Sequence, residues 1–167
     1  MSLNLRARLR EETKKSHQSL EESFPFCNLM KEEGIEQSSN EAFYRFHDLF
    51  FDYLKKESDG REFYADLLNV FEKASLSKDR LLQVESREEK LAMEYLLLGS
   101  RMGNRLLLSK NPKIKECSFA AYFEMSLPAN LWEEFILKLD EVKESEAQDR
   151  VIHLANHYFN VLKSPRS

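Results

Sequence analysis

The chain has 167 residues, 42% of them hydrophobic and 32% charged, which is enough to build one domain with a sizeable core. Its formal net charge of −4 argues against a general affinity for nucleic acid, and four Gly and four Pro are too few for an architecture of many short strands. The charged N-terminus lacks the apolar core of a signal peptide, and no apolar run reaches the roughly eighteen residues of a membrane span. Cys27 and Cys117 lie far apart without metal-type spacing. We therefore expect a cytoplasmic protein with reduced thiols and a single domain over residues 1–167.

Apolar residues recur at helical spacing along almost the whole chain. A first helix is predicted over about 4–23, and the Phe-Pro-Phe sequence at 24–26 ends it because the residue before a proline disfavours helix. The pair Ser38 and Glu41 has the spacing of a capping box and predicts the start of an aromatic second helix. The Asp-Gly pair at 59–60 ends that helix.

A third helix is predicted over 61–74, followed by a short link through Ser77 with room for one helical turn. A second capping box, Ser86 and Glu89, starts a long glycine-bearing helix. This helix is expected to end before the Asn-Pro pair at 111–112.

The last third of the chain is expected to form three helices. The first is short and covers 118–126, and a proline then introduces a helix over 131–142. Ser145 and Gln148 are spaced as a third capping box and predict the last helix, which ends near 164–165. No strand or hairpin pattern competes, so the predicted fold is all-α.

Gly99 and Gly103 lie within the most helix-prone stretch of the chain. Each glycine costs roughly 1 kcal/mol relative to alanine in a helix interior. Because they are four residues apart, they share one face and leave a strip of backbone without side chains, against which something flat and bulky fits. Two simpler interpretations remain open: Gly99 ends the helix, with a turn following to Asn104, or the glycines let two helices pack closely.

His17 is the strongest candidate ligand, with Glu21 one helical turn further along. A neutral imidazole binds iron or zinc and can ligate a haem axially, while a carboxylate on the other ring nitrogen fixes its tautomer. The simpler alternative is a boundary histidine beside a solvated glutamate.

Three motifs together resemble the haem (heme) oxygenase family, and most closely its bacterial, biliverdin-forming, phytochrome-associated branch. They are Leu9-Arg10-x-x-Thr13-x-x-x-His17-x-x-Leu20-Glu21, Leu98-Gly99-Ser100-x-Met102-Gly103 and Val151-Ile152-x-x-Ala155-x-x-x-Phe159. The resemblance covers nearly the whole chain and implies a single-domain, haem-oxygenase-like multi-helical bundle. It implies that haem lies between the first helix and the glycine-bearing distal helix, with His17 as the iron ligand.

The resemblance also assigns roles to the residues around the haem. The residues implied to bind the cofactor are His17, Glu21, Arg10, Lys14, Arg101, Asn104, Lys138 and Phe159, with the cations directed at the anionic propionates. The residues implied to be catalytic are Ser100, Gly99 and Gly103. Three positions depart from the family pattern: Ser100 stands where many members have aspartate, Asn104 replaces a second glycine, and Arg101 brings a cation to the distal segment.

The implied reaction opens haem to biliverdin, CO and ferrous iron, with O₂ and electrons from a separate reductase or ferredoxin. One alternative is a haem carrier or sensor without turnover. A second is a helical interaction protein in which Arg101 fills the cleft. A third is another small-molecule enzyme on this scaffold, such as the thiamin-degrading group, which would need Cys27 or Cys117 as a nucleophile.

Overall fold

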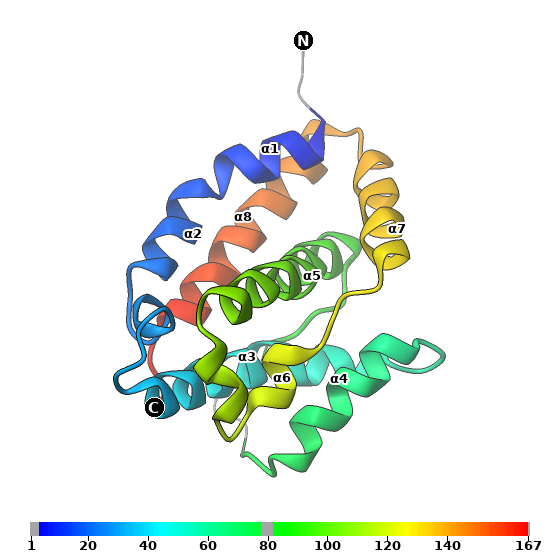
Figure 1. Cartoon of the computed structure of the whole chain (residues 1–167). Coiled ribbons are helices and arrows are strands. Elements are labelled where there is room, and N and C mark those ends of the chain that lie inside the picture. The colour runs from blue at the N-terminus through cyan, green and yellow to red at the C-terminus, as the bar shows by residue number, and fades with distance from the viewer. Residues whose placement is uncertain (1–3, 78–81, 167) are drawn as a thin grey trace.

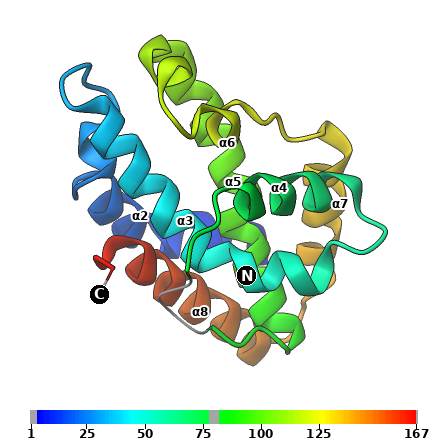
Figure 2. The same ribbon diagram turned by 90° about the horizontal axis from the view of Figure 1, so that it is seen from below.

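The computed structural model describes residues 4–77 and 82–166, and every regular element within them is a helix. Residues 78–81 of the link predicted through Ser77, and with them the possible helical turn there, therefore lie outside the described residues. In chain order the elements are α1 Leu5–Glu12, α2 Lys14–Glu21, the 3₁₀ turn η1 Phe26–Asn28, α3 Ile35–Glu57, α4 Glu62–Lys73, α5 Arg87–Lys110, the 3₁₀ turn η2 Pro112–Glu116, α6 Ala120–Glu124, α7 Ala129–Asp140 and α8 Ser145–Lys163 (Figures 1 and 2). The predicted all-α class is confirmed.

The predicted first helix is in fact two helices that meet at Thr13. The Thr13 hydroxyl is buried and donates to the carbonyl of Leu9 at 2.6 Å, and its backbone departs from helical angles at φ −102° and ψ 0°. His17 N–H nevertheless donates to the Thr13 carbonyl at 2.9 Å, so α2 follows α1 directly (Figure 1). The side chain of Asn156 on α8 donates to the Glu12 carbonyl and so satisfies one of the acceptors that the end of α1 leaves free.

The predicted start of α3 at Ser38 is wrong by about one turn. The helix begins at Ile35 after Gly34, whose φ of +70° places it in the left-handed region that glycine tolerates. Ser38 is buried within the helix, and the carboxylate of Glu41 accepts from Arg45 instead of capping the start.

The start of α5 is confirmed as predicted. Ser86 Oγ accepts from Glu89 N–H, and the Glu89 carboxylate accepts in turn from Ser86 N–H, which completes the capping box. The helix then runs without a break through both Gly99 and Gly103 to Lys110. Gly99 is therefore not a helix end, and that interpretation is wrong.

The last three helices lie where they were predicted, although both their starts and their ends differ slightly from the predicted bounds. Pro128 is the N-cap of α7, and α8 begins at Ser145 without a side-chain cap. The third capping box is wrong because the amide of Gln148 is used elsewhere. It donates to the Val142 carbonyl at 2.8 Å and accepts from Arg8 on α1.

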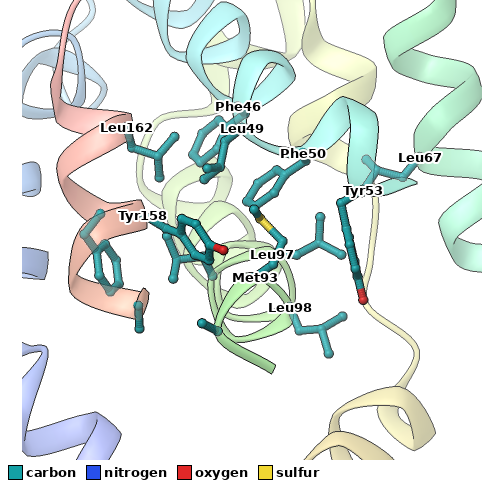
Figure 3. Close-up of a cluster of buried hydrophobic side chains, with 14 of the residues drawn as sticks. Phe46, Leu49, Phe50, Tyr53, Leu67, Met93, Leu97, Leu98, Tyr158 and Leu162 are labelled. Atoms are coloured by element: carbon teal, nitrogen blue, oxygen red, sulfur yellow. The ribbon is translucent and has the colours of Figure 1, made fainter. Parts of the chain in front are cut away.

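The core lies where α3, α5 and α8 meet (Figure 3). Close packing at this junction brings together residues from four helices: Phe46, Leu49, Phe50 and Tyr53 of α3, Leu67 of α4, Met93, Leu97 and Leu98 of α5, and Tyr158 and Leu162 of α8. Burial of these apolar side chains holds α8 against α5, and α8 also packs against α2. Among the helices of residues 4–77 and 82–166, none is long and apolar enough to cross a membrane.

Candidate functional site

The candidate site is formed by α2 and α5, which both pack against α8 (Figure 1). Figures 1 and 2 show α8 running alongside both the α1–α2 pair and α5, so that the predicted ligand helix and the glycine-bearing helix contact the same neighbour. The two helices that the sequence singled out are therefore neighbours of the same buried helix.

His17 lies on the exposed face of α2, with 57% of its side chain accessible to solvent. The imidazole stacks on Phe159 of α8, with ring centroids 5.2 Å apart and planes 22° apart. Its Nε2 lies 3.1 Å from a carboxylate oxygen of Glu21. The structure thus brings three predicted site residues together and orients the imidazole by packing on one side and by a carboxylate at its edge.

Gly99 and Gly103 face open space. A Cβ atom built on either glycine would meet no heavy atom within 4 Å. The interpretation that the glycines permit close packing of two helices is therefore wrong for the described part of the chain. The same face of α5 exposes Met102 and Leu106, 47% and 57% accessible, so the bare backbone is flanked by apolar side chains.

Ser100 is half-buried at the edge of this glycine face. Its hydroxyl donates to the carbonyl of Leu97 at 2.8 Å, a bond within α5. While that bond is made, Ser100 can accept a hydrogen bond but does not supply a proton.

Arg101 and Asn104 do not lie on the glycine face, which corrects the predicted contact of Arg101 with a propionate and the predicted place of the Asn104 amide beside the haem pocket. The two side chains are 1% and 6% exposed, and both lie near Tyr122 of α6. Arg101 donates through Nη1 to the Tyr122 carbonyl, and its guanidinium carbon lies 4.0 Å from the centre of the Tyr122 ring. The alternative of a helical interaction protein expected Arg101 to fill a cleft at the glycines. The structure does not show this arrangement, because Arg101 contacts Tyr122 instead.

The remaining predicted cations are exposed. Arg10 is at the end of α1 and Lys14 at the start of α2, on either side of the break at Thr13. Lys138 is exposed on α7, a helix that packs against both α1 and α5. The break at Thr13 means that Arg10 and His17 do not share one continuous helical face.

A second buried polar cluster was missed by the sequence reasoning. Glu94 of α5 is 5% exposed and accepts hydrogen bonds from Tyr53 at 2.7 Å and from Tyr64 at 2.9 Å. Arg61 completes the cluster, with Nη2 3.6 Å from the Glu94 carboxylate and its guanidinium 3.9 Å from the Tyr64 ring centre. The only signal in the sequence was that Glu94 occupies a core position of its helix. That position does not indicate which tyrosines or arginine the carboxylate would contact. The cluster joins α3, α4 and α5.

The cysteines do not form a nucleophilic site. Cys27 is exposed, whereas Cys117 is buried and donates its thiol toward the Lys113 carbonyl. Burial raises the pKa of Cys117 above its ordinary value, which opposes formation of the thiolate. Within the described residues no three His, Cys, Asp or Glu side chains gather as a metal site.

Comparison of the chain with models of known families, with curated proteins and with solved structures gives no match.

Proposed function

We propose that the chain binds haem between α2 and α5 and opens it as a haem-oxygenase-like monooxygenase. The observation that carries the proposal is the open strip of α5 backbone at Gly99 and Gly103, on a helix that packs against the same α8 as the His17 helix. A planar ligand needs such a strip because any side chain there would hold it away from the helix. The finer fold, a haem-oxygenase-like bundle, is part of this proposal.

His17 is the residue that would bind the haem iron. An imidazole has two ring nitrogens, so Glu21 can orient one nitrogen while the other binds the metal. The side chain of Glu21 is 66% exposed and free to turn, and Phe159 supports the ring from the α8 side. Arg10 and Lys14 are the cations proposed to hold the propionates, because both are exposed close to His17 in the chain.

Bound haem supplies both the iron that activates O₂ and the ring that is oxidised. The chain's own contribution is to hold the ring against α5, to limit access of water and to place hydrogen-bonding groups beside the distal face. Met102 and Leu106 supply apolar cover for the open strip. Ser100 accepts a hydrogen bond from water at this face while its own proton is donated to Leu97.

A second candidate, a haem carrier or sensor, is favoured by that same Ser100 hydrogen bond. A hydroxyl already donating within its helix delivers a proton poorly, and ring opening needs protons at the distal face. Both candidates share the haem site and differ in turnover.

The test is a haemin titration followed by addition of ascorbate under O₂. We expect saturable appearance of a Soret band at micromolar haemin, replaced during turnover by the absorption of biliverdin with release of CO. The variant His17→Ala should lose the spectroscopic signature of histidine ligation. The matched variant His153→Ala removes another exposed histidine, on α8, and should behave as the parent chain. A Soret band that persists under turnover identifies the carrier, and absence of saturable binding refutes both candidates.

A further inference from the structure

The buried side of α5 meets α6 in a polar cluster formed by Arg101 and Asn104 of α5 and Tyr122 of α6, here called the Arg101 cluster. It lies away from the open glycine face, and the haem proposal uses none of its atoms. Arg101 and Tyr122 are among the largest fully buried side chains of the described residues. The ring of Tyr122 is itself packed among Phe43, Phe46 and Phe71.

Arg101 is a buried cation without a counter-ion. No carboxylate among residues 4–77 and 82–166 forms an ion pair with it, and its neighbour Tyr122 supplies a carbonyl oxygen and the face of a ring. The surroundings of the cluster are aromatic, so water cannot screen the charge. A buried, unpaired charge is strongly unfavourable, whereas the same charge beside an anion is tolerated.

The atoms of the cluster that lack a hydrogen-bond partner are all able to donate. They are Nε and Nη2 of Arg101, Nδ2 of Asn104 and the hydroxyl of Tyr122. Ser100, which borders the cluster, and Arg101 and Asn104 all lie close enough to the Tyr122 hydroxyl to oppose the rise in its pKa that burial causes. A donor-rich, positively charged and buried set of this kind is complementary to an anion rather than to a cation or an apolar ligand.

The guanidinium geometry selects the shape of that anion. Nη1 is used by the Tyr122 carbonyl, and the two nitrogens left over, Nε and Nη2, form one edge of the guanidinium. This edge donates two parallel hydrogen bonds to two oxygens of one planar group.

We propose that the Arg101 cluster binds a small planar oxyanion of single negative charge, of the formate, bicarbonate or nitrate class. Nε and Nη2 of Arg101 hold two of its oxygens, and the amide of Asn104 and the hydroxyl of Tyr122 donate to it from the side. The site neutralises the guanidinium in the core. It does not rest on haem binding, because its residues are turned away from Gly99 and Gly103.

The experiment measures unfolding by urea in sodium formate and in sodium gluconate at equal ionic strength, since gluconate is too bulky for a buried site. Formate at ten times its dissociation constant should raise the folding equilibrium constant about elevenfold, and the effect should follow a saturation curve. Arg101→Leu should abolish the response. That variant replaces a buried charge by an apolar side chain and is expected to fold. Arg105→Leu, at an exposed arginine one turn along α5, is the matched control and should keep the full response.

Asn104→Ala provides a second variant if Arg101→Leu does not fold, and it should weaken formate binding several-fold. The line width of ¹³C-formate provides a direct readout of binding that is independent of unfolding. Equal unfolding curves in formate and gluconate would show that the folded chain binds no formate, and an unchanged formate response in Asn104→Ala would show that formate binds elsewhere. Either result would overturn the proposal.

Discussion

The imidazole of His17 lies flat on the ring of Phe159, so the exposed candidate ligand on α2 is fixed by a residue of α8. The ring is held in place by stacking even though most of its edge is accessible. A ligand residue that must meet an incoming metal benefits from this arrangement, because its orientation is set before binding.

Phe159→Leu is expected to weaken haemin binding about two- to tenfold. The leucine keeps an apolar side chain at this position of α8, but it removes the stacking between the Phe159 ring and the His17 imidazole, which is worth about 0.5–1.5 kcal/mol. Haemin titration measures the affinity, and the imidazole resonances of His17 report the loss of ring stacking. Phe135→Leu, the same change at a buried site on α7, is the control and should leave haemin affinity unchanged.

Gly99→Ala and Gly103→Ala are expected to stabilise the protein and impair haem binding. Each should raise the free energy of unfolding by about 1 kcal/mol, because alanine favours the helix and its Cβ meets no neighbour. The same methyl group projects from the strip where the haem is proposed to lie. Urea unfolding and haemin titration give the two readouts.

Ser109→Ala, at an exposed position of α5, controls for helix propensity. It should add about 0.5 kcal/mol and leave haemin affinity unchanged. If the glycine variants bound haemin as tightly as the parent chain, haem would not lie along this strip.

Glu94→Gln is expected to destabilise the fold by about 3 kcal/mol. The substitution removes the negative charge opposite Arg61 and directs an amide group at two tyrosine hydroxyls that donate to the carboxylate. Urea unfolding measures the loss. Glu72→Gln, at an exposed position of α4, should change stability by less than about 0.5 kcal/mol.

Stability is expected to fall above pH 10 because of the buried tyrosines. Burial raises the pKa of Tyr122 and of Tyr158 to about 12, and it raises the pKa of Tyr53 and Tyr64 further. Between pH 10 and the raised pKa, the unfolded chain loses its tyrosine protons while the folded chain keeps them. The contribution of each raised pKa to the free energy of unfolding is therefore complete below pH 10 and is lost as the pH rises toward the folded pKa. Each tyrosine contributes a slope of about 1.4 kcal/mol per pH unit in that range.

Urea unfolding between pH 8 and pH 11.5 measures this slope. Tyr158→Phe should reduce it by the contribution of one tyrosine. A slope that is unchanged in this variant would mean that Tyr158 titrates equally in the folded and unfolded chain.

Local patterns predicted the helices well, and they failed where a side chain had a distant partner. The capping box at Ser86 and Glu89 was confirmed because both hydrogen bonds are local. The pair Ser145 and Gln148 has the same spacing, but the Gln148 amide is drawn to Val142 and Arg8, and Arg8 is 140 residues away in sequence. Spacing alone cannot reveal such competition.

The candidate site shows the same limit. Helical periodicity placed Gly99 and Gly103 on one face, and the structure leaves that face open. The same periodicity could not reveal that Arg101 turns to Tyr122, because its partner lies 21 residues further along on a different helix. The break at Thr13 was also missed, since a threonine within a helix is compatible with either a straight or a bent course.

The continuity of α5 through its two glycines has a consequence for how the chain assembles. Residues 87–98 begin at a complete capping box and contain good helix formers, so the intrinsic helix propensity of this half is the higher of the two. Residues 99–110 contain both glycines, and their order depends on neighbours such as Tyr122, against which Arg101 packs. We expect amide protons of the second half to exchange with solvent sooner than those of the first, so the segment proposed to receive the ligand is also the less protected half of its helix.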